Sequence, residues 1–161
     1  MKVIFVCTGN TCRSPMAESI AKSLFKNENI TVESRGIFAL DHQPISKLSE
    51  EIIHEQELPQ PSLTQSFSEK DIEANLILTM SQSHKAILKS QYGSVTNIFT
   101  LIEFVGDESE VNDPYGGDKK IYLNTYKQIY DLISKINPKD LQENYISVSY
   151  THLTLPTTPY V

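Results

Sequence analysis

Basic residues are in short supply in this sequence, which narrows the kinds of partner that the protein can bind. Of the 161 residues, 14 are lysine or arginine and 20 are aspartate or glutamate, which gives a formal net charge of -6. Binding to nucleic acid through its phosphates requires clustered lysine and arginine, and so does a polybasic membrane anchor. We therefore expect neither a nucleic-acid partner nor a membrane partner.

Long apolar runs and cysteines are also scarce. The longest uninterrupted apolar run, Val3 to Cys7, is far shorter than the roughly 20 residues of a membrane-spanning helix and shorter than the core of a signal peptide. The two cysteines, Cys7 and Cys12, cannot hold a secreted scaffold together with disulfides. We expect a cytoplasmic protein whose cysteines are present for their chemical reactivity and not as a disulfide framework.

Strands and helices are expected to alternate along the chain. Short runs of β-branched and aromatic residues predict four strands, at residues 2–7, 30–34, 74–79 and 95–100. Apolar residues at helical spacing predict helices between these strands and after the last one. The alternation favours right-handed crossovers and a mostly parallel sheet covered on both faces. We expect one domain over residues 1–146, followed by a non-native or disordered tail at 147–161.

Several single residues have a specific expected place. Ser14 and Pro15 fit the N-cap and the first position of the first helix. Tyr122 and Tyr126 lie on the packing stripe of the last long helix and are expected in the core. Three histidines lack the spacing of metal ligands and are expected on the solvated surface, namely His42, His54 and His84.

The loop after the first predicted strand carries the strongest chemical signal. It reads Cys-Thr-Gly-Asn-Thr-Cys-Arg-Ser from Cys7 to Ser14 and leads into a helix. Converging backbone amides and a helix N-terminus bind a phosphate dianion without a metal, and they also stabilise a thiolate at Cys7. Arg13 can grip two phosphate oxygens, Ser14 can donate to the Cys7 sulfur, and Asn10 can brace the loop. Each residue alone also fits an ordinary structural role, but together they favour an anion site with a nucleophile.

A phosphatase that uses a cysteine also needs an acid for its leaving group. Asp113 lies in a loop shaped by proline and glycine, after the fourth predicted strand. An aspartate before proline commonly starts a turn. Its combination with the cysteine loop favours the catalytic interpretation.

The Cys-x5-Arg-Ser-Pro motif and the later Asp-Pro-aromatic motif resemble the low-molecular-weight protein tyrosine phosphatase family. The resemblance implies a flavodoxin-like three-layer α/β fold with a four-stranded parallel sheet in the order 2-1-3-4, and no metal or other cofactor. It also implies a phosphocysteine at Cys7, with Asp113 acting first as acid and then as base. Cys12 would pair with Cys7 under oxidation. The residues implied in binding phosphate and substrate are Thr8, Gly9, Asn10, Thr11, Cys12, Arg13, Ser14 and Tyr115.

Two departures from that family bear on the substrate. Thr11 replaces a usual aliphatic residue, and Gly116 follows Tyr115 where a second aromatic is usual. Both features resemble the bacterial protein arginine phosphatases. The expected partner is therefore a phosphorylated protein, with phosphoarginine favoured over phosphotyrosine, and the expected state is a monomer or weak dimer. Arg35 also departs from the family, which often has alanine there, and the sequence assigns it no role.

Two other activities remain open from the sequence. An arsenate reductase would need a cysteine outside the loop to relay a disulfide, and this chain has no third cysteine. A phosphocysteine carrier of the sugar-transport type would have little use for Asp113 or for the Arg13 clamp. Both are weaker alternatives than a phosphatase.

Overall fold

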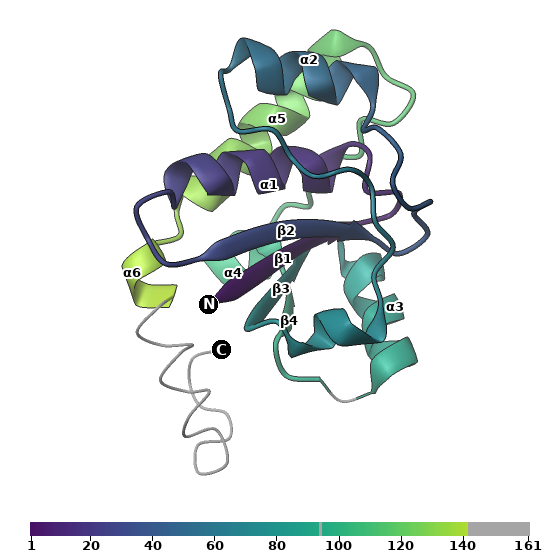
Figure 1. Cartoon of the computed structure of the whole chain (residues 1–161), viewed down its shortest axis with the longest axis vertical. Coiled ribbons are helices and arrows are strands. Elements are labelled where there is room, and N and C mark those ends of the chain that lie inside the picture. The colour runs from purple at the N-terminus through teal and green to yellow at the C-terminus, as the bar shows by residue number, and fades with distance from the viewer. Residues whose placement is uncertain (94, 142–161) are drawn as a thin grey trace.

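A four-stranded parallel sheet forms the middle layer of the protein (Figure 1). The computed structural model describes residues 1–93 and 95–141. The strands are β1 (Lys2–Cys7), β2 (Thr31–Gly36), β3 (Leu76–Thr79) and β4 (Ile98–Thr100). Their order is β2-β1-β3-β4, and every neighbouring pair is parallel. The predicted fold class and strand order are confirmed.

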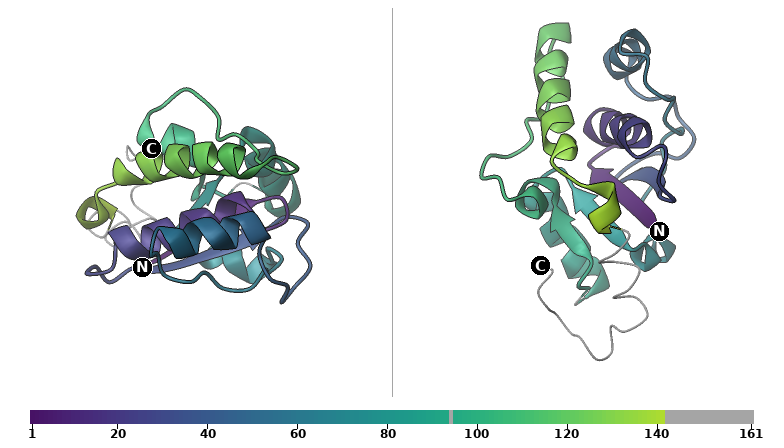
Figure 2. Two further views of the ribbon diagram at one scale, coloured as in Figure 1. Left: turned by 90° about the horizontal axis from the view of Figure 1, so that it is seen from above. Right: turned by 90° about the vertical axis from the view of Figure 1, so that its left-hand side faces the viewer.

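Helices cover both faces of this sheet. On one face α1 (Arg13–Leu24) packs against α2 (Lys47–Glu55) and α5 (Lys119–Ser134), and the short α4 (Leu101–Val105) lies beside α5. Figure 2 shows α1 and α5 running side by side over the sheet. The other face carries α3 (Gln82–Tyr92) and the 3-10 helix η1 (Glu69–Glu73). A last short helix, α6 (Pro138–Leu141), follows α5.

The central strand β1 supplies side chains to two cores. Val3 and Phe5 pack with α1, α2 and α5, whereas Ile4 and Val6 pack with Leu88 of α3. Successive residues of a strand point to opposite faces, and a strand covered on both faces is therefore apolar throughout. Both cores meet at β1, so the chain leaves the sheet at Cys7 from a rigid support.

The start of α1 differs from the prediction. The helix begins at Arg13 with Cys12 in the N-cap position, and no side chain caps it. The prediction that Ser14 caps the helix and that Pro15 is its first residue is wrong. The Ser14 hydroxyl is fully buried and contacts Cys7, Asn10 and the Arg35 carbonyl instead.

Other boundaries differ by a few residues. β2 continues to Gly36, whereas β3 begins at Leu76 and β4 at Ile98. The two shortest helices, α4 and α6, were not predicted, because a helix of four or five residues carries no periodic apolar stripe. Tyr122 and Tyr126 are buried, as expected.

The structure describes the chain up to Leu141. The expected domain boundary at residue 146 and the expected tail at 147–161 lie outside the described residues. Among residues 1–93 and 95–141, none of the helices has the length and apolar character needed to cross a bilayer.

Candidate active site

The anion loop, which we define as residues 7–14, joins the end of β1 to the start of α1. It packs tightly against the end of β2, where Gly36 lies. A Cβ atom at Gly36 would come within 2.7 Å of the Asn10 nitrogen and 2.8 Å of the Thr8 carbonyl oxygen. Only glycine permits this approach without a shift of the backbone. The sequence analysis did not reveal this role of Gly36.

Asn10 holds the anion loop in its shape. Its φ angle is 58°, in the left-handed region that asparagine tolerates better than most residues. Its side-chain nitrogen donates to Ser14 Oγ at 2.8 Å and to Ser34 Oγ at 2.9 Å. Its side-chain oxygen accepts from the Gln65 amide at 2.9 Å. The predicted brace is present, and it ties the loop to two distant segments.

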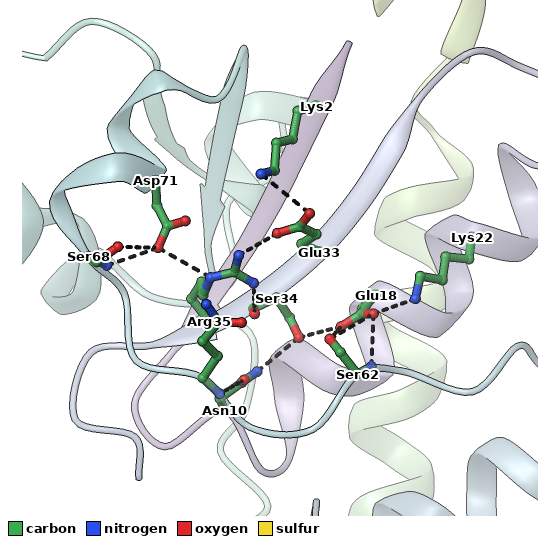
Figure 3. A network of polar contacts seen from close by, with 11 residues as sticks. Lys2, Asn10, Glu18, Lys22, Glu33, Ser34, Arg35, Ser62, Ser68 and Asp71 are labelled. Atoms are coloured by element: carbon green, nitrogen blue, oxygen red, sulfur yellow. Dashed lines mark hydrogen bonds and ion pairs between the residues drawn. The ribbon is translucent and has the colours of Figure 1, made fainter. Parts of the chain in front are cut away.

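The hydrogen bonds continue from Asn10 to a buried carboxylate (Figure 3). Ser34 Oγ donates to Glu18 at 2.6 Å, and the Ser62 amide donates to the same carboxylate at 3.1 Å. Lys22 forms an ion pair with it at 2.6 Å. Glu18 is fully buried, so these partners offset the cost of removing its charge from water. Sequence reasoning missed Glu18, although its position one turn after Ser14 on the buried face of α1 was a signal.

Arg35 of β2 forms ion pairs that connect this strand to η1, a structural role that the sequence did not suggest. Its Nε donates to Asp71 at 3.2 Å, and the same guanidinium forms an ion pair with Glu33. Burial by itself would raise the pKa of Glu33, but the hydrogen bond and charge of Arg35 and the charge of Lys2 lower it. Asp71 also caps η1 by accepting from the Ser68 amide at 2.9 Å. The network fixes the strand end on which the anion loop rests.

The nucleophile candidate lies at the base of the loop. Cys7 is 3% exposed, and its Sγ lies 2.9 Å from Ser14 Oγ. Ser14 has one proton, which it can donate to this sulfur or to the Arg35 carbonyl at 3.3 Å. Because Asn10 donates to Ser14 Oγ, that bond leaves the Ser14 proton available to these two acceptors. Donation to a thiolate is the stronger bond and would stabilise the charged nucleophile.

Arg13 and Asp113 meet above the same loop. Arg13 Nη2 lies 3.6 Å from Asp113 Oδ2, and Arg13 Nη1 donates to the Val111 carbonyl at 3.3 Å. Asp113 also accepts from the Tyr115 amide at 3.1 Å, which is the bond of an Asx turn. The turn role and the site role are therefore compatible, since one oxygen serves the turn and the other faces Arg13.

Cys12 lies in the loop with a partner from α5. Its Sγ is 3.2 Å from the Tyr122 hydroxyl and 3.6 Å from Thr11 Oγ1. Burial and the contact with Cys12 raise the pKa of Tyr122 to about 12, so this hydroxyl stays protonated at neutral pH. Both cysteines are free thiols.

The expectation for His84 is wrong. This histidine is 4% exposed, and its Nε2 lies 2.9 Å from Thr8 Oγ1. Burial, followed by the charge of Arg13, lowers the pKa of His84 to about 4. His42 and His54 are exposed, as expected. The sequence pattern did not reveal His84 because its burial depends on the closeness of α3 to the end of β1.

The substrate-facing candidates lie around the loop. Thr8 and Tyr115 are exposed. Thr11 lies against Gly9, because a Cβ atom built on Gly9 would be 3.6 Å from Thr11 Oγ1. Gly116 has a φ angle of 81°, a conformation that would strain an aromatic residue. In the described ranges, 1–93 and 95–141, no group of three or more His, Cys, Asp and Glu side chains could hold a metal ion.

The arrangement gathers a buried thiol, a guanidinium and a carboxyl group around one anion loop. The loop supplies the amides of a helix N-terminus, which favour a bound dianion. Such a set can carry out nucleophilic attack on a phosphoryl group and protonate a leaving group. Of the predicted catalytic residues, Cys7 and Arg13 lie in the anion loop, and Asp113 contacts Arg13.

Comparison with known proteins gives consistent matches. The model of the family described as low molecular weight phosphotyrosine protein phosphatase matches residues 2–146. A low molecular weight protein-tyrosine-phosphatase PtpB of Staphylococcus epidermidis is 55% identical over 139 residues, which cover 86% of this chain and 99% of the relative.

Two solved structures resemble this one in fold and sequence. A YwlE arginine phosphatase mutant with a phosphorylated active-site serine is 36% identical, with a TM-score of 0.83 over 89% of this chain and 97% of that chain. A low molecular weight protein tyrosine phosphatase from T. tengcongensis is 40% identical, with a TM-score of 0.80 over 84% of this chain and 96% of that chain.

Proposed function

Because the chain belongs to the low molecular weight phosphotyrosine protein phosphatase family and is a hydrolase of that kind, we propose that it dephosphorylates phosphoarginine in proteins through a phosphocysteine at Cys7. The observation that carries the proposal is the convergence of Cys7, Arg13 and Asp113 on one anion loop. The solved YwlE arginine phosphatase with a phosphorylated active-site serine supports both parts of it, the covalent intermediate and the substrate class.

In the first step the Cys7 thiolate attacks phosphorus and the bond to the leaving atom breaks. Ser14, 2.9 Å away, favours the thiolate, while the loop amides and Arg13 bind the phosphoryl oxygens. Asp113 gives its proton to the leaving atom. The ion pair between Arg13 and Asp113 keeps both side chains at the loop until the substrate phosphate binds the Arg13 guanidinium in place of Asp113.

In the second step water attacks the phosphocysteine. The ionised Asp113 takes a proton from the water as its oxygen bonds to phosphorus, and the sulfur–phosphorus bond breaks. Inorganic phosphate leaves, and Cys7 returns to the thiolate. The Cys7 charge is again held by Ser14 and the loop amides.

Two residues favour arginine over tyrosine as the phosphorylated side chain. A guanidinium is planar and carries N–H donors, and the Thr11 hydroxyl offers those donors an acceptor. A phenyl ring instead needs apolar walls, and Gly116, with its φ angle of 81°, removes one such wall beside Tyr115. Thr11 and Gly116 thus suit a polar leaving group better than an aromatic one.

Phosphotyrosine is the second candidate substrate, because the curated relative at 55% identity is named a protein-tyrosine-phosphatase. Tyr115, which is 79% exposed, could stack on a substrate ring. The chemistry at Cys7 would be the same for both substrates.

The deciding experiment is Thr11→Ile, assayed on phosphoarginine and phosphotyrosine peptides side by side. Isoleucine leaves the guanidinium N–H groups without a partner, at a cost of about 1–3 kcal/mol. We expect kcat/KM on phosphoarginine to fall about tenfold or more while that on phosphotyrosine holds or rises.

The matched control is Thr31→Ile, an exposed threonine at the opposite end of the sheet, which should change neither value. A parallel change on both substrates in Thr11→Ile, or a wild-type preference for phosphotyrosine, would leave tyrosine as the substrate.

A further inference from the structure

His84 is a buried histidine that has one hydrogen-bonded ring nitrogen. Its Nε2 lies 2.9 Å from Thr8 Oγ1, and its Nδ1 has no hydrogen-bond partner among the described residues. Burial of an unpaired polar nitrogen is costly, and a leucine could fill much of the same space without that cost. A residue that breaks a packing rule in this way often serves a site. The bond to Thr8 is the contact that distinguishes histidine from an apolar residue here.

The fold places this bond at the start of the anion loop, beside Cys7. The Met80 amide donates to the Val6 carbonyl at 2.9 Å, so α3, which begins two residues later, starts beside the end of β1. Thr8 directly follows Cys7 and is exposed. The charges of Arg13 and Asp113 both act on the His84 ring. Thr8 therefore lies on the same loop as Arg13, and Asp113 contacts that loop through Arg13.

The Thr8 oxygen keeps hydrogen-bonding capacity after it has bonded to His84. If Nε2 donates, the oxygen retains one lone pair and its own proton; if Nε2 accepts, the oxygen retains two lone pairs. In either tautomer Thr8 can accept one more hydrogen bond. A water molecule that gives one proton to Asp113 has a second O–H group, which needs such an acceptor.

We propose that His84 is a positioning residue that fixes the Thr8 hydroxyl so that it orients the water attacking the phosphocysteine. The inference rests on the proposed two-step function. Thr8 accepts the second O–H group of the water, Asp113 takes the first proton, and the oxygen is thereby turned toward phosphorus. As the oxygen–phosphorus bond forms, the sulfur–phosphorus bond breaks and Cys7 departs as a thiolate.

His84 itself takes no part in proton transfer. Burial and the charge of Arg13 lower its pKa to about 4, so the ring is neutral at pH 7. A neutral ring adds no cation beside Arg13 and does not compete with it for phosphate. Its contribution is to hold the Thr8 side chain in one rotamer.

The test compares Thr8→Val, His84→Leu and the double variant in the full chain, with an activated aryl phosphate as substrate. Both single variants should lower kcat about tenfold, the loss of one hydrogen bond. The phosphocysteine trapped by acid quench in the steady state should rise, or stay saturated, because the second step is slowed. The double variant should be no slower than Thr8→Val, since His84 acts through Thr8.

Two further variants separate this role from a packing effect. His84→Gln places an amide within reach of Thr8 and should recover part of kcat, whereas His54→Leu, at an exposed histidine of α2, should match the wild type. If His84→Leu does not fold, Thr8→Val and His84→Gln decide the matter by the same trapping assay.

Additive losses in the double variant, a fall in trapped phosphocysteine, or a Thr8→Val variant that matches the wild type would overturn the inference. Failure of the proposed function looks different, because the wild type would then form no phosphocysteine at all.

Discussion

Replacing Asn10 tests how the anion loop is held. Asn10→Ala removes the part-buried hydrogen bond from the Gln65 amide, a loss of about 0.5–1.5 kcal/mol. It also forces an alanine to a φ angle of 58°, which costs about 1–2 kcal/mol. The donors to Ser14 and Ser34 are lost as well. We expect the free energy of unfolding to fall by roughly 3–5 kcal/mol, a large fraction of the ~5–15 kcal/mol of a typical domain.

Asn10→Gly separates the two causes. Glycine loses the same hydrogen bonds but adopts the left-handed conformation without strain, so it should be less destabilising than alanine by about 1 kcal/mol. Asn27→Ala, at an exposed asparagine after α1, is the matched control and should change the unfolding free energy by less than about 0.5 kcal/mol.

Urea unfolding followed by circular dichroism measures all three variants. The midpoint should move while the slope m stays constant, since the surface exposed on unfolding is nearly unchanged. A loss below about 1 kcal/mol in Asn10→Ala would refute the accounting of buried hydrogen bonds. Equal losses for alanine and glycine would refute the part assigned to backbone strain.

Four other perturbations have defined outcomes. Asp113→Asn should slow phosphopeptide hydrolysis more than hydrolysis of an activated aryl phosphate, whose leaving group needs no proton; equal losses would make Asp113 a turn residue only. Mild peroxide should inactivate the enzyme reversibly through a Cys7–Cys12 disulfide, whereas Cys12→Ser should not recover with a thiol reductant, and unchanged recovery would contradict this. For His84, the lowered pKa of about 4 means that the unfolded chain binds more protons between pH 6.5 and 4, so this residue's contribution to stability falls as pH falls through that range. On going from above pH 6.5 to pH 4.5, the Tm of the wild type should therefore fall relative to that of His84→Gln. A Tm difference that does not change with pH would refute the lowered pKa of His84. Gly36→Ala should weaken phosphate binding measured by calorimetry, since the added Cβ meets backbone atoms of the anion loop at 2.7 to 2.8 Å; unchanged affinity would show that the loop can move aside.

The sequence predicted the fold and the catalytic candidates because both depend on local patterns. The buried strand, the turn-forming loop and the helical stripe after it are contiguous, so Cys7 and Arg13 could be placed together from spacing alone. Asp113 required one further step, since parallel strands end at the same edge of a sheet. Asp113 Oδ2 lies 3.6 Å from Arg13 Nη2, as that step requires.

The supporting residues could not be predicted, because their partners are distant in sequence. Glu18 is satisfied by Ser34 and Ser62, and His84 is buried by the approach of α3 to Thr8. A single sequence gives a charged or titratable residue no visible reason to be inside. Ser14 was predicted both as a helix cap and as a partner of the Cys7 sulfur, and only the contact with the sulfur is present.

The hydrogen bonds of Asn10 also have a consequence for how the protein folds. The anion loop spans eight neighbouring residues, yet its shape depends on Ser34 and Gln65, which are 24 and 55 positions from Asn10. Closing such long stretches of chain costs entropy before any contact repays it. The loop should therefore acquire its binding geometry only when β2 and the segment after α2 have docked. Appearance of phosphate affinity during refolding would then report completion of this half of the domain, and an isolated peptide carrying the complete Cys-x5-Arg motif should bind phosphate no better than a scrambled one.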